Sequence, residues 1–409
     1  MAEREILRMQ KSSFPGDTQN ERQLKALKKE YADAIIFKDY ALKRRNSQRI
    51  SATLTEVAPK ITVKPEILDA DPYLLNTPSA TYDLRYGPLL SHEHLHNDFI
   101  TKQTAVDPSN NGMDIWLSFL NTIFVHDEHL INYVQQIAGL GAIGLVFETM
   151  IIAFGAGNNG KSTLWNSIKN VLGTYSGIIS ADALTTACRR NIKPEIAELR
   201  GKRLIIASEL EEGVSLSTSV MKMLASTDTI KAEKKYKDPF EFRPSHTLIL
   251  MTNYLPDINS GVHSKGTWRR INVIPFAANI PAQNDIKSFS DYLCKNAGGA
   301  ILSWIIEGAQ KIITNEFKLE TPEAVLKATG KYKADNDWLD RFLSECCEIG
   351  NSFCVKSSEF LAAFKVFNEQ TGENSKTAST IRAAMTAKGF TYKQTRNGII
   401  VHGLRLRNS

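Results

Sequence analysis

The first clear pattern along the chain is helical. Between Glu21 and Arg49, apolar side chains recur every three or four positions while most other positions are charged or polar, which predicts an amphipathic helix in solvent. The apolar positions are Leu24, Leu27, Tyr31, Ile35 and Leu42. Four prolines and a Gly-Pro pair follow, and they predict short strands and turns between Ile61 and Thr104. We therefore expect residues 1–110 to form a separate helical and mixed region.

The middle of the chain alternates between strand-like and helix-like patterns. Three runs of apolar and β-branched residues predict buried strands, and segments of helical period lie around them. The expected strands are Val146–Phe154, Arg203–Ser208 and Ser245–Thr252, and the expected helices are Met113–Phe124, Glu128–Gly139, Ser162–Leu172 and Ser217–Leu224. Such alternation is typical of an α/β fold with a largely parallel sheet. We predict this domain for residues 111–315.

The pattern changes again after Asn315. Helical segments are followed by two strand-like runs, Phe390–Lys393 and Ile399–His402, joined through a turn of Arg396, Asn397 and Gly398. Helices that end in a hairpin are typical of a winged helix. We predict a winged-helix-like domain for residues 316–409.

Composition narrows the class of protein without naming a function. The 409 residues suggest two to four domains, and 42% apolar with 23% charged residues excludes a disordered or collagen-like chain. Fifty basic against 44 acidic residues give a net charge of +6, which permits nucleic-acid binding but does not require it. The five cysteines form no C-x-x-C pair, so we expect no zinc ribbon or disulfide framework and a reducing, cytoplasmic location. The longest apolar stretch, Gly139–Phe154, is too short for a membrane span and contains Glu148.

A glycine-rich segment between an expected strand and an expected helix carries the firmest chemical signal. Its sequence matches G-x-x-x-x-G-K-[ST], in which backbone N–H groups converge on phosphates at a helix N-terminus. Lys161 would reach the β- and γ-phosphates of ATP, and Ser162 would hold Mg²⁺. The alternative, an accidental glycine-rich turn, is disfavoured by the strand and helix on either side. The expected nucleotide-binding residues are Gly155, Ala156, Gly157, Asn158, Asn159, Gly160, Lys161, Ser162 and Thr163.

Three further positions suit nucleotide hydrolysis. Glu209 directly follows an expected strand, where a carboxylate could hold Mg²⁺ and polarise the attacking water. Ser208 precedes it where a second acid is expected, which leaves direct metal coordination open. Asn253 ends the next strand and could sense the γ-phosphate, although an asparagine before a proline is also a common turn residue. Arg269 and Arg270 could stabilise charge on a neighbouring subunit's nucleotide, or form surface ion pairs.

Taken in order, these segments resemble the superfamily III helicase domain, and more closely the phage and plasmid primase-helicase family with its poxviral relatives. The resemblance rests on residues 155–163, 199–213, 221–233, 252–256 and 268–271. Residues 68–76, 82–85, 342–347 and 389–390 also resemble the family's flanking regions, so the likeness covers most of the chain. It implies an AAA-like P-loop ATPase that acts as a ring, usually a hexamer, around DNA. The N-terminal region would be a collar or oligomerisation surface, and the family's primase domain is expected to be absent.

The resemblance also assigns roles to individual residues. Lys161 and Ser162 match the Walker A residues, Glu209 the Walker B acid and Asn253 the sensor. Arg270 matches the arginine finger, with Arg269 as the second choice. The family places a channel hairpin between Ile230 and Phe242, and its expected DNA-binding residues here are Lys231, Lys234, Lys235, Tyr236 and Lys237.

The resulting prediction is an ATP-dependent DNA helicase or translocase that moves 3′ to 5′ in the replication of a phage, plasmid or other mobile element. Single-stranded and forked DNA, further copies of the chain, and a separate primase or polymerase are the expected partners. One alternative is a nucleotide switch of the same fold. Another is an ATP-regulated, origin-binding initiator or loader without unwinding. Its recognition residues would be Arg382, Lys388, Lys393 and Arg396.

Two other patterns invite a metal-site interpretation that we disfavour. Asp69 and Asp71 have the D-x-D form of a primase metal site but no companion motif. His92, His94 and His96 have a spacing that suits a strand better than a zinc helix.

Overall fold

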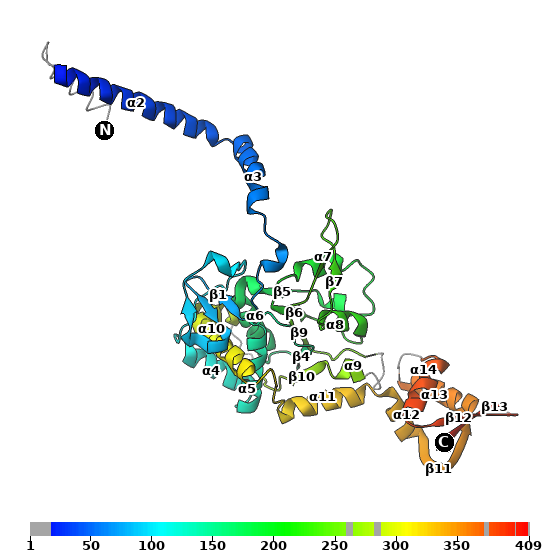
Figure 1. Ribbon diagram of the computed structural model, residues 1–409. Coiled ribbons are helices and arrows are strands. Elements are labelled where there is room, and N and C mark those ends of the chain that lie inside the picture. The colour runs from blue at the N-terminus through cyan, green and yellow to red at the C-terminus, as the bar shows by residue number, and fades with distance from the viewer. Residues whose placement is uncertain (1–17, 259–264, 282–287, 372–375, 397, 408–409) are drawn as a thin grey trace. The chain divides into compact units, whose positions relative to one another are not determined.

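The computed structural model describes residues 18–258, 265–281, 288–371, 376–396 and 398–407 (Figure 1). The chain divides into two compact units, Met1–Leu68 and Asp69–Ser409. Among the described residues, no helix is both long enough and apolar enough to cross a membrane.

The described residues of the first unit form the α-helices α2 (Thr18–Arg44) and α3 (Ser47–Ile61) and the short 3-10 helix η1 (Pro65–Ile67). The single helix expected from Glu21 to Arg49 is wrong at its end. The Asn46 side chain accepts a hydrogen bond from the backbone N–H of Arg49 at 2.9 Å and so caps a new helix. No residue of α3 is buried, and Leu54 and Ile61 are among its exposed apolar side chains.

The second unit begins with a small antiparallel sheet of three short strands in the order β1-β2-β3. These are β1 (Leu74–Asn76), β2 (Thr81–Asp83) and β3 (Ser91–His92). The helices α4 (Met113–Ile123) and α5 (Glu128–Leu140) follow close to the expected limits. The expectation of short strands, then two helices, is therefore confirmed.

A five-stranded sheet in the order β10-β4-β9-β6-β5, with every neighbouring pair parallel, forms the centre of the second unit. Its strands are β4 (Met150–Phe154), β5 (Ser176–Ile178), β6 (Leu204–Ser208), β9 (Thr247–Thr252) and β10 (Ile271–Pro275). The surrounding helices are α6 (Lys161–Leu172), α7 (Lys193–Glu198), α8 (Thr218–Leu224), α9 (Lys265–Trp268), α10 (Phe289–Thr314) and α11 (Glu323–Asp335). Strands β7 (Ile230–Ala232) and β8 (Phe240–Phe242) form a separate antiparallel hairpin. The α/β core with a parallel sheet is thus confirmed.

The sheet is buried on both faces. Along β4, Ile151 and Ala153 belong to the hydrophobic core that includes α4, α5, α6 and α10, whereas Met150 and Ile152 belong to the core on the other face. This two-sided burial explains why the strand segments are apolar without interruption.

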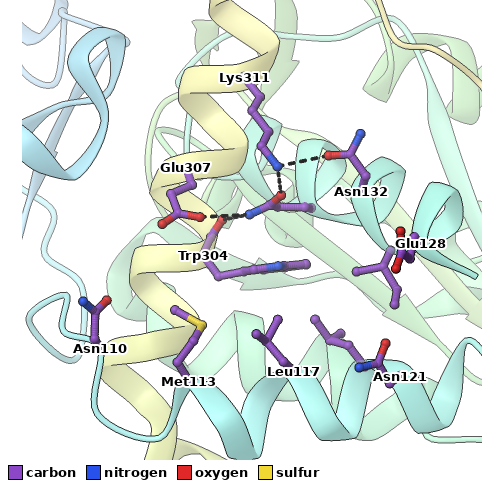
Figure 2. Close-up of a pocket in the computed structure, with 12 residues that line it drawn as sticks. Asn110, Met113, Leu117, Asn121, Glu128, Asn132, Trp304, Glu307 and Lys311 are labelled. Carbon is purple, nitrogen blue, oxygen red and sulfur yellow. Dashed lines mark hydrogen bonds between the residues drawn. The ribbon is translucent and has the colours of Figure 1, made fainter. Parts of the chain in front are cut away.

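Helix α10 packs closely against α5. A Cβ added to Gly139 would lie 2.2 Å from the backbone nitrogen of Ala309, and one added to Gly308 would lie 2.2 Å from the carbonyl oxygen of Gln135. Polar contacts continue along the same helix pair, where the Lys311 ammonium donates to Gln135 Oε1 at 2.6 Å, beside a pocket of about 610 Å³ (Figure 2). The two glycines therefore allow a helix contact that any side chain would prevent.

The C-terminal part comprises three helices and a three-stranded antiparallel sheet in the order β11-β13-β12. The elements are α12 (Trp338–Cys346), β11 (Cys347–Lys356), α13 (Ser357–Thr371), α14 (Ala378–Ala387), β12 (Thr391–Thr395) and β13 (Gly398–Leu406). They enclose a third hydrophobic core, in which the Phe342 ring meets Phe360 and Phe364 edge to face. The expected strand pair is present, and β11 is a third strand that the sequence pattern did not indicate.

Candidate nucleotide site

The glycine-rich loop connects the carboxyl end of β4 to the first turn of α6. Asn158 and Gly160 have positive φ values of 56° and 77°, which curl the backbone. The buried amide of Asn159 lies beneath this curl and donates to the carbonyl oxygens of Ala156 and Phe276. Its Oδ1 atom accepts from the backbone N–H of Lys161 at 3.3 Å. Asn159 therefore holds the loop to the strand end on one side and to the helix on the other.

Lys161 is the first residue of α6 and is only 5% exposed. Its ammonium donates to the carbonyl oxygen of Gly155 at 3.0 Å and to Oδ1 of Asn253 at 2.6 Å. Burial lowers the pKa of the Lys161 side chain, because desolvation disfavours its charge. The fold thus joins two predicted site residues that lie 92 positions apart.

Glu209 lies at the same edge of the sheet. Its backbone N–H donates to the carbonyl oxygen of Met251 at 3.1 Å, and Ser208 pairs with Met251 in the β6–β9 register. Glu209 adopts a φ of 70°, and its side chain is exposed. The hydroxyl of Ser162, in the first turn of α6, is also exposed. Both groups present hard oxygen ligands of the kind that Mg²⁺ prefers, so these two residues could hold that ion with phosphate oxygens and water.

A cavity of about 780 Å³ opens in front of the loop, which is within the usual range for small-molecule sites. Loop residues 157–163 and Asn253 form one part of its wall. Helices α4 and α10 form the opposite part, with Asp114, Ser118, Phe119, Thr122, Phe289 and Tyr292 among the side chains. No sequence motif had indicated these six residues. The i, i+4, i+8 spacing of Asp114, Ser118 and Thr122 was the only local sign that one face of α4 borders a polar space.

Arg269 and Arg270 lie at the opposite edge of the sheet from the loop, because they precede β10 and β10 runs parallel to β4. The Arg270 side chain is only 12% exposed. It donates to Glu148 Oε2 and to the carbonyl oxygen of Gly266, both at 2.9 Å. Arg269 is 65% exposed and approaches Glu148 Oε2 at 3.4 Å. Neither arginine lines the cavity of its own chain.

The β7–β8 hairpin projects from the second unit (Figure 1). Two of its lysines are engaged in ion pairs, Lys231 with Glu241 at 3.5 Å and Lys234 with Glu198 of α7 at 3.3 Å. Lys235, Tyr236 and Lys237 at the tip are exposed, and Tyr236 has a φ of 60°. The five predicted DNA-binding residues are therefore together in one hairpin, away from the nucleotide cavity.

Two patterns that we disfavoured as metal sites serve the backbone. The Asp69 carboxylate accepts from the backbone N–H of Thr101 at 2.7 Å, and Asp71 accepts from that of Tyr73 at 2.9 Å. A ring nitrogen of His94 lies 2.9 Å from the carbonyl oxygen of Thr77. These contacts hold turns beside the small sheet.

The four basic residues considered for duplex recognition differ in their surroundings. Lys388 forms ion pairs with Asp337 and Asp340, and the Arg382 guanidinium lies 4.8 Å from the centre of the Tyr392 ring. Lys393 and Arg396 are exposed on β12 and the turn after it.

Comparisons with known proteins connect this site to viral replication proteins. A family described as "D5 N terminal like" matches residues 10–125, and a family of unknown function, DUF5906, matches residues 153–270. A protein named as a helicase, L207/L206 of Acanthamoeba polyphaga mimivirus, is 29% identical over 217 residues, or 51% of this chain. A protein named as a primase, C962R of African swine fever virus (isolate Tick/Malawi/Lil 20-1/1983), is 24% identical over 302 residues, or 68% of this chain.

These matches support a phage or viral primase-helicase family. The matched stretch is 22% of the mimivirus protein and 31% of the African swine fever virus protein, so the chain spans less than a third of either relative. Among solved structures, the A form apo structure of the NrS-1 C-terminal region aligns with 86% of this chain and 89% of its own, at 14% identity and a TM-score of 0.47. A second apo structure of that region, residues 305–718, has 16% identity and a TM-score of 0.45. Likeness at this level supports no functional conclusion.

The loop geometry predicts that two of its glycines differ in tolerance to substitution. Gly160→Ala places a Cβ 2.3 Å from Cγ2 of the buried Ile123 at a positive φ, so we expect the free energy of unfolding to fall by about 2 kcal/mol. Gly157→Ala is the matched control, because no atom lies within 4 Å of its added Cβ. Urea unfolding followed by circular dichroism measures both. Equal stability of the two variants would contradict the loop conformation described here.

Proposed function

We propose that the chain is an ATP-dependent DNA helicase or translocase of a phage, plasmid or other mobile genetic element. One observation carries the proposal: the Lys161 ammonium is buried at the mouth of a nucleotide-sized cavity and is held by Asn253 and the loop carbonyl of Gly155. A bound nucleotide could replace these hydrogen-bond acceptors of Lys161. A γ-phosphate entering the cavity would accept from Lys161 in place of the Gly155 carbonyl, leaving Asn253 beside the phosphate and the attacking water.

The hydrolysis we propose follows from this placement. The Glu209 carboxylate accepts a proton from a water whose oxygen attacks the γ-phosphorus, and the bond to the bridging oxygen of ADP breaks. Mg²⁺, held through Ser162 and Glu209, would supply neutralisation of phosphate charge. Lys161 stabilises the charge on the transferred group, and Asn253 orients it.

An arginine from a neighbouring copy would complete the site, since neither arginine of the pair reaches the cavity of its own chain. The sequence comparison favours Arg270 for this role. The contacts of the chain favour Arg269, because Arg270 would have to release Glu148 and the carbonyl oxygens of Gly266 and Ala225 to reach another subunit. A ring of copies, with six as the family's usual number, follows as part of the proposal.

The hairpin tip is the proposed DNA contact. Lys235 and Lys237 are exposed on either side of Tyr236, an arrangement that suits phosphate contacts around a base stacked on the tyrosine ring. Lys231 and Lys234 form exposed ion pairs with Glu241 and Glu198, which they could exchange for contacts with DNA phosphates. Movement of these hairpins with each hydrolysis would draw one strand through the ring, 3′ to 5′ by family resemblance. Forked DNA and a separate primase or polymerase remain the proposed partners.

The C-terminal part favours a second candidate, an initiator or loader that binds duplex DNA and uses ATP for assembly. Its helices and hairpin have the order of a winged helix, and Lys393 and Arg396 are exposed on and beside β12. This candidate would retain duplex affinity without strand separation.

The loop lysine gives the direct test of hydrolysis. We expect Lys161→Ala to lower the rate of phosphate release from ATP by at least about 100-fold, because the charged donor to the transferred phosphate is lost. Lys169→Ala, eight positions further along α6 and outside the cavity, is the matched control and keeps the wild-type rate. Phosphate release is measured with and without single-stranded DNA. Wild-type hydrolysis by Lys161→Ala would refute the proposed site.

The hairpin is tested by the salt dependence of DNA binding. Each lysine that neutralises a phosphate of single-stranded DNA contributes about 0.7 to the slope of log affinity against log salt. Removing both tip lysines in Lys235→Ala/Lys237→Ala should reduce the slope by about 1.4. Fluorescence anisotropy with a labelled single strand, over a range of salt concentrations, measures it.

The double variant Lys318→Ala/Lys327→Ala controls for net charge, since it also removes two exposed lysines but lies away from the hairpin. Its slope should equal that of the wild type. If both double variants lose the same slope, the hairpin has no special role in DNA binding.

A further inference from the structure

We propose that α4 and α10 form a subsite for the purine base and ribose of the nucleotide, with Tyr292 as the stacking surface. This inference rests on the proposed function, because it assigns the half of the same cavity that the glycine-rich loop leaves unexplained. Helix α10, which carries Tyr292, lies outside both family matches, residues 10–125 and 153–270.

The aromatic wall is built in three layers. Phe119 of α4 is buried, and its ring meets Phe289 edge to face with centroids 5.7 Å apart. Phe289 in turn stacks on Tyr292, with centroids 5.4 Å apart and only 10° between the ring planes. Tyr292 is 46% exposed although it lines the cavity. The buried Phe119 ring and the partly buried Phe289 ring therefore support an open aromatic ring, which is the arrangement that a flat base can stack on at little entropic cost.

The polar side chains of α4 that line the cavity show which of its ends is near the glycine-rich loop. Asp114, Ser118 and Thr122 face it from successive turns, and eight residues of helix span about 12 Å. Thr122 lies at the loop end, because the next residue, Ile123, packs against Gly160. Asp114 is at the far end. Phosphates held by the loop therefore place the sugar and base toward Asp114 and Tyr292.

The chemistry at the far end fits a nucleoside. The Asp114 carboxylate is exposed and can accept hydrogen bonds from ribose hydroxyls, the contact that acidic residues make in other nucleotide sites. Stacking depends on ring area and tolerates different bases, so the larger purines should bind better than pyrimidines. The subsite thus favours purine nucleoside triphosphates over bare triphosphate.

The test compares two probes, Mg²⁺-ATP and Mg²⁺-tripolyphosphate, by isothermal titration calorimetry. Tyr292→Ala should weaken ATP binding about tenfold and leave tripolyphosphate binding unchanged, since only ATP carries a base to stack. Tyr292→Phe keeps the ring and should bind ATP as the wild type does. Tyr86→Ala removes a tyrosine of similar exposure, 55%, outside the cavity, and should have no effect on either probe.

Lys161→Ala distinguishes a failure of the proposed phosphate site from a failure of the proposed base subsite. If Tyr292→Ala binds ATP like the wild type while Lys161→Ala weakens both probes, the phosphate site stands and the base subsite is refuted. If Lys161→Ala changes neither probe but Tyr292→Ala still weakens ATP alone, the subsite is supported and the catalytic assignment of Lys161 fails. Equal weakening of both probes by Tyr292→Ala would also refute stacking, because tripolyphosphate has no base.

Discussion

Parallel pairing of β4 with β9, and of β9 with β6, decides where the candidate groups of the nucleotide site lie. The carboxyl ends of these three strands meet at one edge of the sheet. The glycine-rich loop follows β4, Asn253 follows β9, and Glu209 follows β6. In the observed register Phe154 pairs with Thr252, and Ser208 pairs with Met251, so the residues that follow the three strands lie side by side. The Lys161–Asn253 hydrogen bond is a consequence of that register.

The same topology separates the arginines from the loop. Arg269 and Arg270 precede a strand that runs parallel to β4, so they must lie at the amino ends of the strands. A motor that uses either arginine on a nucleotide therefore needs a second copy of the chain. Glu148 accepts hydrogen bonds from both guanidinium groups. It would therefore compete with a nucleotide of a neighbouring copy for either arginine.

Much of this arrangement could be predicted from local sequence. A few consecutive residues are enough to indicate each buried strand and the glycine-rich loop. The same holds for the polar residues that follow β6 and β9. The missing part depends on contacts between distant segments. Phe289 and Tyr292 line the cavity together with residues of α4 because α10, far along the chain, packs against α4, α5 and α6. The largely buried Arg270 guanidinium is paired with Glu148, 122 positions earlier. The break between α2 and α3 had a local cause, the Asn46 cap, which the helical period concealed.

The central claim is that hydrolysis at the loop drives the hairpin along a DNA strand. Strand displacement on a forked DNA, measured together with ATP hydrolysis in the same reaction, tests it most directly. We predict that the wild type separates the strands only with Mg²⁺-ATP, whereas Lys235→Ala/Lys237→Ala hydrolyses ATP without separating them. ATP hydrolysis by the wild type with no strand separation would refute the motor and favour an initiator or loader, whereas full separation by the hairpin variant would refute the role of the hairpin tip.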